Sequence, residues 1–153
     1  MSSTSTTKPP PWDGEPDDDQ FVAHGLRCRM KRNASGTWCG YVLIPGHHPM
    51  AGLSDSDLYH LDVHGGVTYA SSQGDGWVIG FDCNHSSDLS QEEWRRFNEN
   101  HPFYGDFYIG REYRTHGFAK GETIKLAKQL WDALSPLQQL AHTSTTTGAS
   151  DET

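Results

Sequence analysis

Five stretches in the first two thirds of the chain have the pattern of β-strands, because they alternate apolar and polar residues or are rich in β-branched and aromatic ones. Turn-forming residues separate the first two stretches and the last two, which predicts two hairpins. In the third stretch, Tyr59, Leu61 and Val63 would share one face of the strand. The predicted strands are residues 25–32, 37–44, 59–64, 67–70 and 77–82.

Helical spacing of apolar residues appears only after these stretches. Ser90, with Glu93 three residues later, has the pattern of a capping box and predicts the start of a short helix. Apolar positions from Thr115 to Leu134 recur with helical spacing and predict a longer helix. Strands followed by helices indicate an α+β domain, with a mainly antiparallel sheet of about five strands and a C-terminal helix packed on one face.

The two ends of the chain differ in composition from the middle. Residues 1–20 are rich in Ser, Thr, Pro and acidic residues, and Trp12 is their one aromatic residue. Such segments bury too little apolar surface to offset the entropy lost on ordering. We therefore predict a disordered acidic tail over 1–20, a single domain over 21–138 and a disordered Ser/Thr-rich tail over 139–153.

The formal net charge of −8 comes mainly from the predicted tails, which leaves the middle of the chain nearly neutral. Its one short basic run, residues 27–32, alternates with apolar residues, so its charges should line the solvated face of one strand. A protein that binds a polyanion would show a basic patch, and none is visible apart from this run. The sequence therefore argues against duplex nucleic acid as the main partner.

The chain has three cysteines and no apolar run of the ~20 residues that cross a bilayer. The N-terminus also lacks the basic-then-apolar pattern of a leader peptide. We expect reduced thiols in a cytoplasm and no membrane partner. Cys39 and Cys83 could join two histidines at a structural zinc, although buried free thiols are the commoner fate of such residues.

Candidate chemistry gathers between residues 47 and 88, where histidines lie beside glycine and aspartate. Asp82, His85 and Asp88 are spaced by three at the end of a predicted strand, which places them on one side of a turn. A carboxylate and an imidazole can bind a divalent metal, or can act as a base with its orienting acid. The competing interpretation is a turn followed by a helix cap, because the spacing is no specific zinc signature.

A second group of candidates lies at glycines. His64-Gly65-Gly66 permits unusual backbone angles and close approach of a ligand, or is a glycine bulge with an incidental histidine. His60, Asp62 and His64 would share one strand face, either as a ligand triad or, more commonly, as a solvated surface. The aromatic stretch 103–108 offers stacking faces near Arg111, Arg114 and Lys120, or packs in the core.

We predict that these segments converge in a single cluster. The predicted catalytic residues are His64, His85, Asp82 and Asp88. The predicted metal ligands, for a divalent ion such as zinc, are His48, His64, His85 and Asp88. The predicted ligand-binding residues are His48, Gly65, Gly66, Gly80, Arg111 and Arg114.

Several motifs occur in a fixed order along residues 36–131. They are WCGYV at 38–42, His48-Pro49, VHGGVTY at 63–69, GFDCNHSSD at 80–88, EYR at 112–114 and LAKQL at 126–130. With this series the chain resembles a family of small bacteriophage and prophage proteins of unassigned function. The resemblance implies a phage origin and action in the cytoplasm of a bacterial host, and it assigns no role to any residue.

Three functions are consistent with these features. The first is an enzyme that hydrolyses a small phosphate-bearing or nucleotide-like molecule through the His/Asp cluster. The second is a non-catalytic binder that sequesters a host signalling nucleotide or inhibits a host defence protein. The third is a structural or virion accessory protein, in which the polar cluster would be surface.

Overall fold

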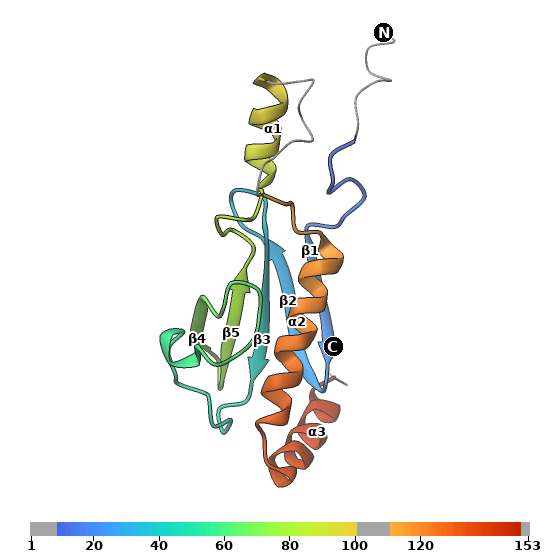
Figure 1. Cartoon of the computed structure of the whole chain (residues 1–153). Helices are drawn as coiled ribbons and strands as arrows, with labels where there is room; N and C mark the ends of the chain where they lie inside the picture. Colours follow the sequence, from blue (N-terminus) through green and yellow to red (C-terminus); the bar gives the residue numbers. More distant parts are fainter. Residues whose placement is uncertain (1–8, 101–110, 151–153) are drawn as a thin grey trace.

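The computed structural model describes residues 9–100 and 111–150, which form one antiparallel sheet and three α-helices (Figure 1). The strand order across the sheet is β1-β2-β3-β5-β4. The strands are β1 (Asp18–Ala23), β2 (Leu26–Arg32), β3 (Trp38–Ile44), β4 (Tyr69–Gln73) and β5 (Gly76–Asp82), and the helices are α1 (Gln91–Asn100), α2 (His116–Asp132) and α3 (Pro136–Ser150). The predicted α+β class, with five antiparallel strands and a helix on one face, is confirmed.

The hairpin of β2 and β3 follows from its turn chemistry. The Asn33 side-chain oxygen accepts hydrogen bonds from the N–H groups of Ser35 and Thr37, at 3.1 and 3.0 Å, and so closes the turn. Antiparallel pairing then places Arg29 opposite Tyr41 and Met30 opposite Gly40. Because side chains alternate between faces, Met30 is fully buried and Arg29 is exposed.

Helix α2 covers one face of the sheet. Its cap is Thr115, where the sequence predicted the helix to begin, and the Thr115 hydroxyl accepts a hydrogen bond from the Phe118 N–H at 3.1 Å. Gly40 on the central strand β3 allows a close approach, because a Cβ atom there would lie 2.2 Å from the Thr123 hydroxyl. The buried residues of the helix share one stripe: Ala119, Thr123, Leu126, Ala127 and Leu130.

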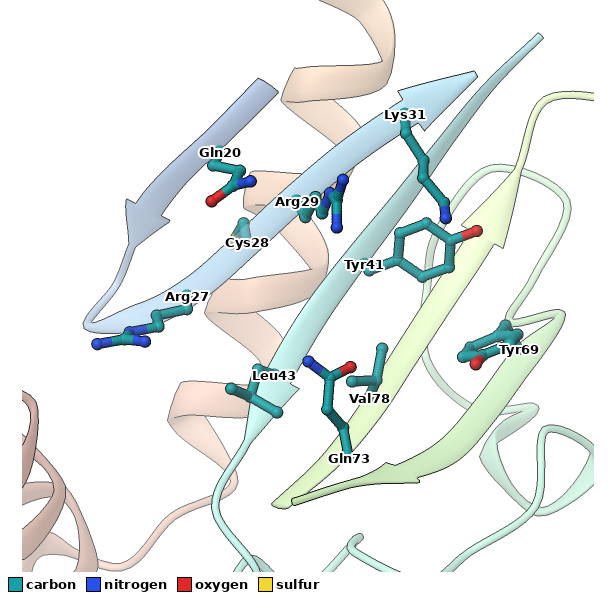
Figure 2. Close-up of a pocket in the computed structure, with 10 residues that line it drawn as sticks. All are labelled: Gln20, Arg27, Cys28, Arg29, Lys31, Tyr41, Leu43, Tyr69, Gln73 and Val78. Carbon is teal, nitrogen blue, oxygen red and sulfur yellow. The ribbon is translucent and has the colours of Figure 1, made fainter. Parts of the chain in front are cut away.

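The opposite face of the sheet is partly exposed, with Arg29 and Lys31 exposed and Tyr41 half-buried. Figure 2 shows Arg29, Lys31 and Tyr41 on this face, with α2 behind the strands. The alternation predicted for the basic run is confirmed, since Arg27, Arg29 and Lys31 are exposed between buried residues.

The predicted strand over residues 59–64 is wrong. The segment pairs with α2 instead of the sheet, because helix side chains take up its backbone hydrogen-bonding groups. Gln129 bonds both the N–H and the C=O of Asp62, each at 2.8 Å, and Glu122 accepts the N–H of His64 at 2.8 Å. Leu61 is buried, as its alternation suggested, but Tyr59 is 85% exposed.

Ordered structure reaches into both predicted tails. β1 begins at Asp18, and the Glu15 carboxylate accepts hydrogen bonds from Arg32 at 2.8 Å, Tyr113 at 2.7 Å and the N–H of His116 at 2.8 Å. These hydrogen bonds hold the segment before β1 against the start of α2. The tail boundary predicted at residue 20 therefore falls inside β1. The sheet has five strands because β1 takes the place of the strand predicted over residues 59–64.

At the other end, α3 extends to Ser150, within the segment 139–153 that was predicted as a disordered Ser/Thr-rich tail. Helix α2 ends at Asp132, with Ala133 as its C-cap, and α3 starts at Pro136, because proline is favourable at the first position of a helix. His142 contacts the Gly25 carbonyl at 2.9 Å, and Gln138 donates to the His47 carbonyl at 3.1 Å. Among the helices of residues 9–100 and 111–150, none has the length and apolar character of a membrane span.

We predict opposite effects for two glycine-to-alanine substitutions. Gly40→Ala should lower the free energy of unfolding by about 1–3 kcal/mol, because the new methyl overlaps Thr123 and the Phe81 ring. Gly121→Ala should raise it by up to about 1 kcal/mol, because Gly121 lies in α2 with nothing within 4 Å of its missing Cβ. Urea unfolding of both variants measures this, and equal effects of the two would contradict the packing described.

Candidate functional site

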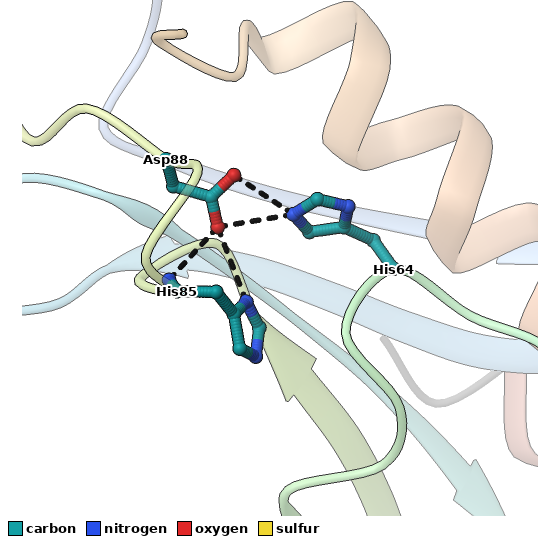
Figure 3. Close-up of side chains that lie close together, drawn as sticks. All are labelled: His64, His85 and Asp88. Atoms are coloured by element: carbon teal, nitrogen blue, oxygen red, sulfur yellow. Dashed lines mark hydrogen bonds and ion pairs between the residues drawn. The ribbon is translucent and has the colours of Figure 1, made fainter. Parts of the chain in front are cut away.

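The centre of the candidate site is the buried carboxylate of Asp88 (Figure 3). Its Oδ1 accepts a hydrogen bond from Arg114 Nε at 2.7 Å and lies 2.9 Å from His64 Nε2. Its Oδ2 accepts the His85 N–H at 2.9 Å and lies 3.0 Å from His64 Nε2 and 3.1 Å from His85 Nδ1. The Asp88 side chain is 0% exposed, so groups of the protein take the place of water around it.

Three segments far apart in sequence supply these side chains. His64 lies in the connection after β3, His85 and Asp88 lie in the loop after β5, and Arg114 precedes the cap of α2. Backbone bonds fix the loop, since the Leu89 N–H donates to the Glu112 carbonyl at 2.9 Å. Tertiary packing therefore assembles the predicted convergence of His64, His85 and Asp88.

The partners of Asp88 set its charge. Burial alone would raise the pKa of its carboxyl, but hydrogen bonds from Arg114, from the His85 N–H and from both imidazoles outweigh burial and hold that pKa at about 2. The carboxylate is therefore ionised at neutral pH and accepts hydrogen bonds from both rings. The proton of neutral His64 lies on Nε2 and that of neutral His85 on Nδ1, which leaves His64 Nδ1 and His85 Nε2 as the basic nitrogens.

The two predicted glycines shape this arrangement in different ways. Both Gly65 and Gly66 have left-handed backbone, with φ of 70° and 84°. A Cβ atom at Gly65 would lie 2.1 Å from the His85 ring, so the bare backbone lets that imidazole approach. The His64 ring also packs edge-on against Phe118, with ring centroids 5.1 Å apart. A Cβ atom at Gly66 would have nothing within 4 Å, so the His85 ring occupies only the space beside Gly65.

Asp82 lies at the edge of the cluster. Its Oδ1 is 3.6 Å from His85 Nε2 and accepts the Asn84 N–H at 3.0 Å, while its Oδ2 accepts the Thr68 hydroxyl at 2.9 Å. The distance to His85 is too long for a strong hydrogen bond to the neutral ring, but the carboxylate would attract an imidazolium through its charge. Asp82 is therefore placed to pair with His85 when that ring carries two protons.

A polar hollow of about 400 Å³ adjoins His85. Arg111 lies in its wall and forms an ion pair with Glu93, so this predicted ligand-binding residue is beside the cluster and not on Asp88. Among the described residues, the rest of the lining consists of serine and asparagine side chains, three carboxylates and a second arginine: Ser35, Asn84, Ser86, Ser90, Asp88, Glu92, Glu93 and Arg96.

The structure separates His48 and Gly80 from the cluster. His48 is buried, with Nε2 donating to the Leu130 carbonyl at 2.7 Å and Nδ1 accepting the Met50 N–H at 2.9 Å. Burial lowers its pKa, so it is a neutral structural residue. Leu130 is about 18 Å along α2 from Phe118, which packs on His64. At Gly80 the bare backbone makes room for Tyr41 on the other face of the sheet.

Sequence reasoning missed the residues of α2 that hold His64. Phe118 packs against its ring and Glu122 accepts its backbone N–H. Residues four apart lie on one face of a helix, so the pair was visible as a face of the predicted helix, but no pattern showed what that face would meet. The aromatic stretch 103–108 lies outside the described residues.

One set of side chains in the described ranges could hold a metal ion. Ligand atoms of His64, His85 and Asp88 lie within 4.8 Å of one another. Two imidazoles and a carboxylate suit zinc and other divalent metals. Cys39 and Cys83 are not part of this set; both are buried free thiols, and burial raises the pKa of each.

Comparisons with protein-family models, with curated proteins and with solved structures found no match to this chain. The functional assignment therefore depends on the geometry of the site.

Asp88 should make stability fall at low pH. Its pKa is lower in the folded state than the ordinary aspartate value of 3.8, so its stabilising effect is complete above about pH 4 and is lost as the pH falls toward 2. The difference corresponds to about 2 kcal/mol. Unfolding titrations from pH 5 to pH 2 should show this loss in the wild type and a smaller one in Asp88→Asn. Identical pH dependence in the two proteins would contradict the ionised, hydrogen-bonded carboxylate.

Proposed function

We propose that this chain hydrolyses a phosphate ester of a small or nucleotide-like molecule, with His64 and His85 as the acid–base groups. The observation that supports this is the single buried carboxylate of Asp88 between the two imidazoles, each with one nitrogen bonded and the other free to exchange a proton. The ring centroids are 5.4 Å apart, so both imidazoles can serve one ligand.

The exposure of the two rings suggests their roles. The His85 side chain is 30% exposed and adjoins the polar hollow, so its Nε2 is the base that takes a proton from water as the water oxygen bonds to phosphorus. The bond from phosphorus to the leaving oxygen breaks, and protonated His64 returns a proton to that oxygen. Asp88 and Arg114 are positioning residues, because they act through the imidazoles, and Asp82 stabilises the imidazolium of His85.

The substrate class is proposed from the hollow beside His85. Its serine and asparagine groups can hydrogen-bond phosphate oxygens, and Arg96 and Arg111 add two cations to the wall. Both arginines are paired with glutamates, Arg96 with Glu92 at 3.2 Å and Arg111 with Glu93. An anionic ligand would replace the two glutamates as the partner of these arginines. With the phage resemblance, we propose that the reaction takes place in the cytoplasm of a bacterial host.

Turnover of phosphate-ester probes tests this function. Bis(p-nitrophenyl) phosphate and p-nitrophenyl phosphate report diester and monoester hydrolysis by release of p-nitrophenolate. His85→Ala and His64→Ala should each lower kcat by about 10²–10⁴-fold, the usual size of a general acid–base contribution. Asp88→Asn should shift the pH profile of kcat, because the rings lose their ionised partner.

The matched control is His60→Ala, which removes an exposed imidazole four residues from His64. It should leave kcat unchanged, and circular dichroism should show that all variants fold. Turnover that survives both His64→Ala and His85→Ala would refute the proposal. Recovery of an intact nucleotide from the purified protein, with no turnover, would favour the non-catalytic binder.

A divalent metal such as zinc is a second candidate at the same three side chains, favoured by their ligand spacing. In that case His64 Nε2, His85 Nδ1 and Asp88 Oδ2 would hold the ion, and Arg114 would remain on Oδ1. The ion would activate water. Arg114 opposes this arrangement, because its guanidinium already neutralises the carboxylate.

Dialysis against a chelator distinguishes the two candidates. The acid–base mechanism predicts unchanged turnover and less than one equivalent of tightly bound zinc by isothermal titration. Loss of turnover on dialysis, restored by zinc in the wild type and not in His85→Ala, would replace it with the metal mechanism.

A further inference from the structure

The exposed face of the sheet carries a second group of residues that the proposed hydrolysis does not use. Strand register aligns Gln20, Arg29, Tyr41, Gly80 and Tyr69 in one row across all five strands. Arg27 and Lys31 flank Arg29 on β2, each about 6.6 Å from it along the strand. Cations therefore lie along one side of an aromatic pair (Figure 2).

The two tyrosines form a surface platform. A Cβ atom at Gly80 would lie 2.6 Å from Tyr41 Cδ1, so the absence of a side chain there lets the Tyr41 ring lie close over the strand. Tyr69 is 46% exposed and meets Tyr41 edge-on, with ring centroids 5.4 Å apart. An aromatic pair that packed the core would be buried by α2, but this pair lies on the face away from it (Figure 2).

The charge of this face is opposite to that of the chain. Arg29 pairs with Asp18 at 2.8 Å, and both side chains are about half exposed, so the pair can exchange with another anion. Arg27 and Lys31 form no ion pair with any residue that the structure describes. Lys31 lies opposite Asp18 in the strand register, so three cations face this one carboxylate. An excess of cations here, on a chain of net charge −8, fits a polyanionic partner for this face.

A hollow of about 380 Å³ lies between the basic strand and the tyrosines. Gln20 and Gln73 line it and offer amide groups to a base edge, and Leu43 and Val78 form its floor. Stacking rings, amides and a row of cations are what a single strand requires, because its unpaired bases stack on aromatic rings while its phosphates meet the cations. A duplex keeps its bases stacked inside and would not use the tyrosines.

We propose that the exposed sheet face binds single-stranded nucleic acid, with bases on Tyr41 and Tyr69 and phosphates along Arg27, Arg29 and Lys31. This site is separate from the imidazoles and Asp88, and it goes beyond the proposed hydrolysis. A polyanionic occupant follows from the charge, and a single strand follows from the accessible aromatic faces.

Fluorescence anisotropy tests the proposal with labelled ten-nucleotide RNA and DNA strands and with a duplex of the same sequence. The full chain should bind a single strand at least tenfold more tightly than the duplex. Tyr69→Ala should weaken binding about tenfold, since stacking contributes about that much per base. The double variant Arg27→Ala/Lys31→Ala should weaken binding and reduce the salt dependence, by about 0.7 in slope for each phosphate that the variant no longer neutralises.

Lys128→Ala is the control, because Lys128 lies exposed on α2, which packs on the other face of the sheet, and it should change neither affinity nor slope. Comparison of the affinities for the RNA and DNA strands shows which nucleic acid the exposed sheet face binds more tightly. Equal affinity for single strand and duplex, no binding of either strand, or unchanged binding by Tyr69→Ala and the double variant would each overturn the proposal. Tyr69 is on an exposed edge strand, so its substitution leaves the core intact even if Tyr41→Ala fails to fold.

Discussion

The ionised carboxylate of Asp88 is the interaction on which the arrangement at this end of the molecule depends. It is fully buried, and three separate segments of chain donate hydrogen bonds to it. A buried charge is stable only when it is paired and hydrogen-bonded, so Arg114 and the His85 N–H are necessary for the ionised form. The two imidazoles complete the set, and their orientation follows from the need to donate toward the carboxylate.

The same carboxylate connects fold and chemistry. Helix α2 holds the backbone of His64 through Glu122, and the chain before its cap supplies Arg114. Gly65 lets the second imidazole come close. Packing of α2 on the sheet thus fixes the spacing of the two rings. A substitution that moves the helix would change the geometry of the site. A carboxylate that orients an imidazole is a recurrent way to make it an effective base.

Local patterns predicted those parts of the fold whose cause is local. The hairpin of β2 and β3 follows from the turn at Asn33 and from alternation, and α2 follows from its cap and its apolar stripe. The strand predicted over residues 59–64 was wrong because alternation indicates which side chains are buried and does not identify what the backbone bonds to. Here the backbone bonds to the side chains of Gln129 and Glu122. β1 was missed because its first three residues, Asp18, Asp19 and Gln20, are polar, and its edge position requires little burial.

The site was predictable in part. His85 and Asp88 are three apart in one loop, so their proximity is local, and a glycine pair marked His64. No pattern indicated that His48 would instead bond the Leu130 carbonyl, because adjacent histidines have the same local signal whatever they meet in space. Nor could spacing show the exposed row of Tyr41 and Tyr69, which depends on strand register across the whole sheet.

The protonation of the two rings tests the central claim most directly. Long-range ¹H–¹⁵N correlation spectra of the ¹⁵N-labelled protein, at a pH where the imidazoles are neutral, distinguish the tautomers of each histidine. With Asp88 ionised between them, His64 should carry its proton on Nε2 and His85 on Nδ1. A spectrum in which His85 carries its proton on Nε2 would contradict the account, because the Asp88 carboxylate would then not be orienting that ring.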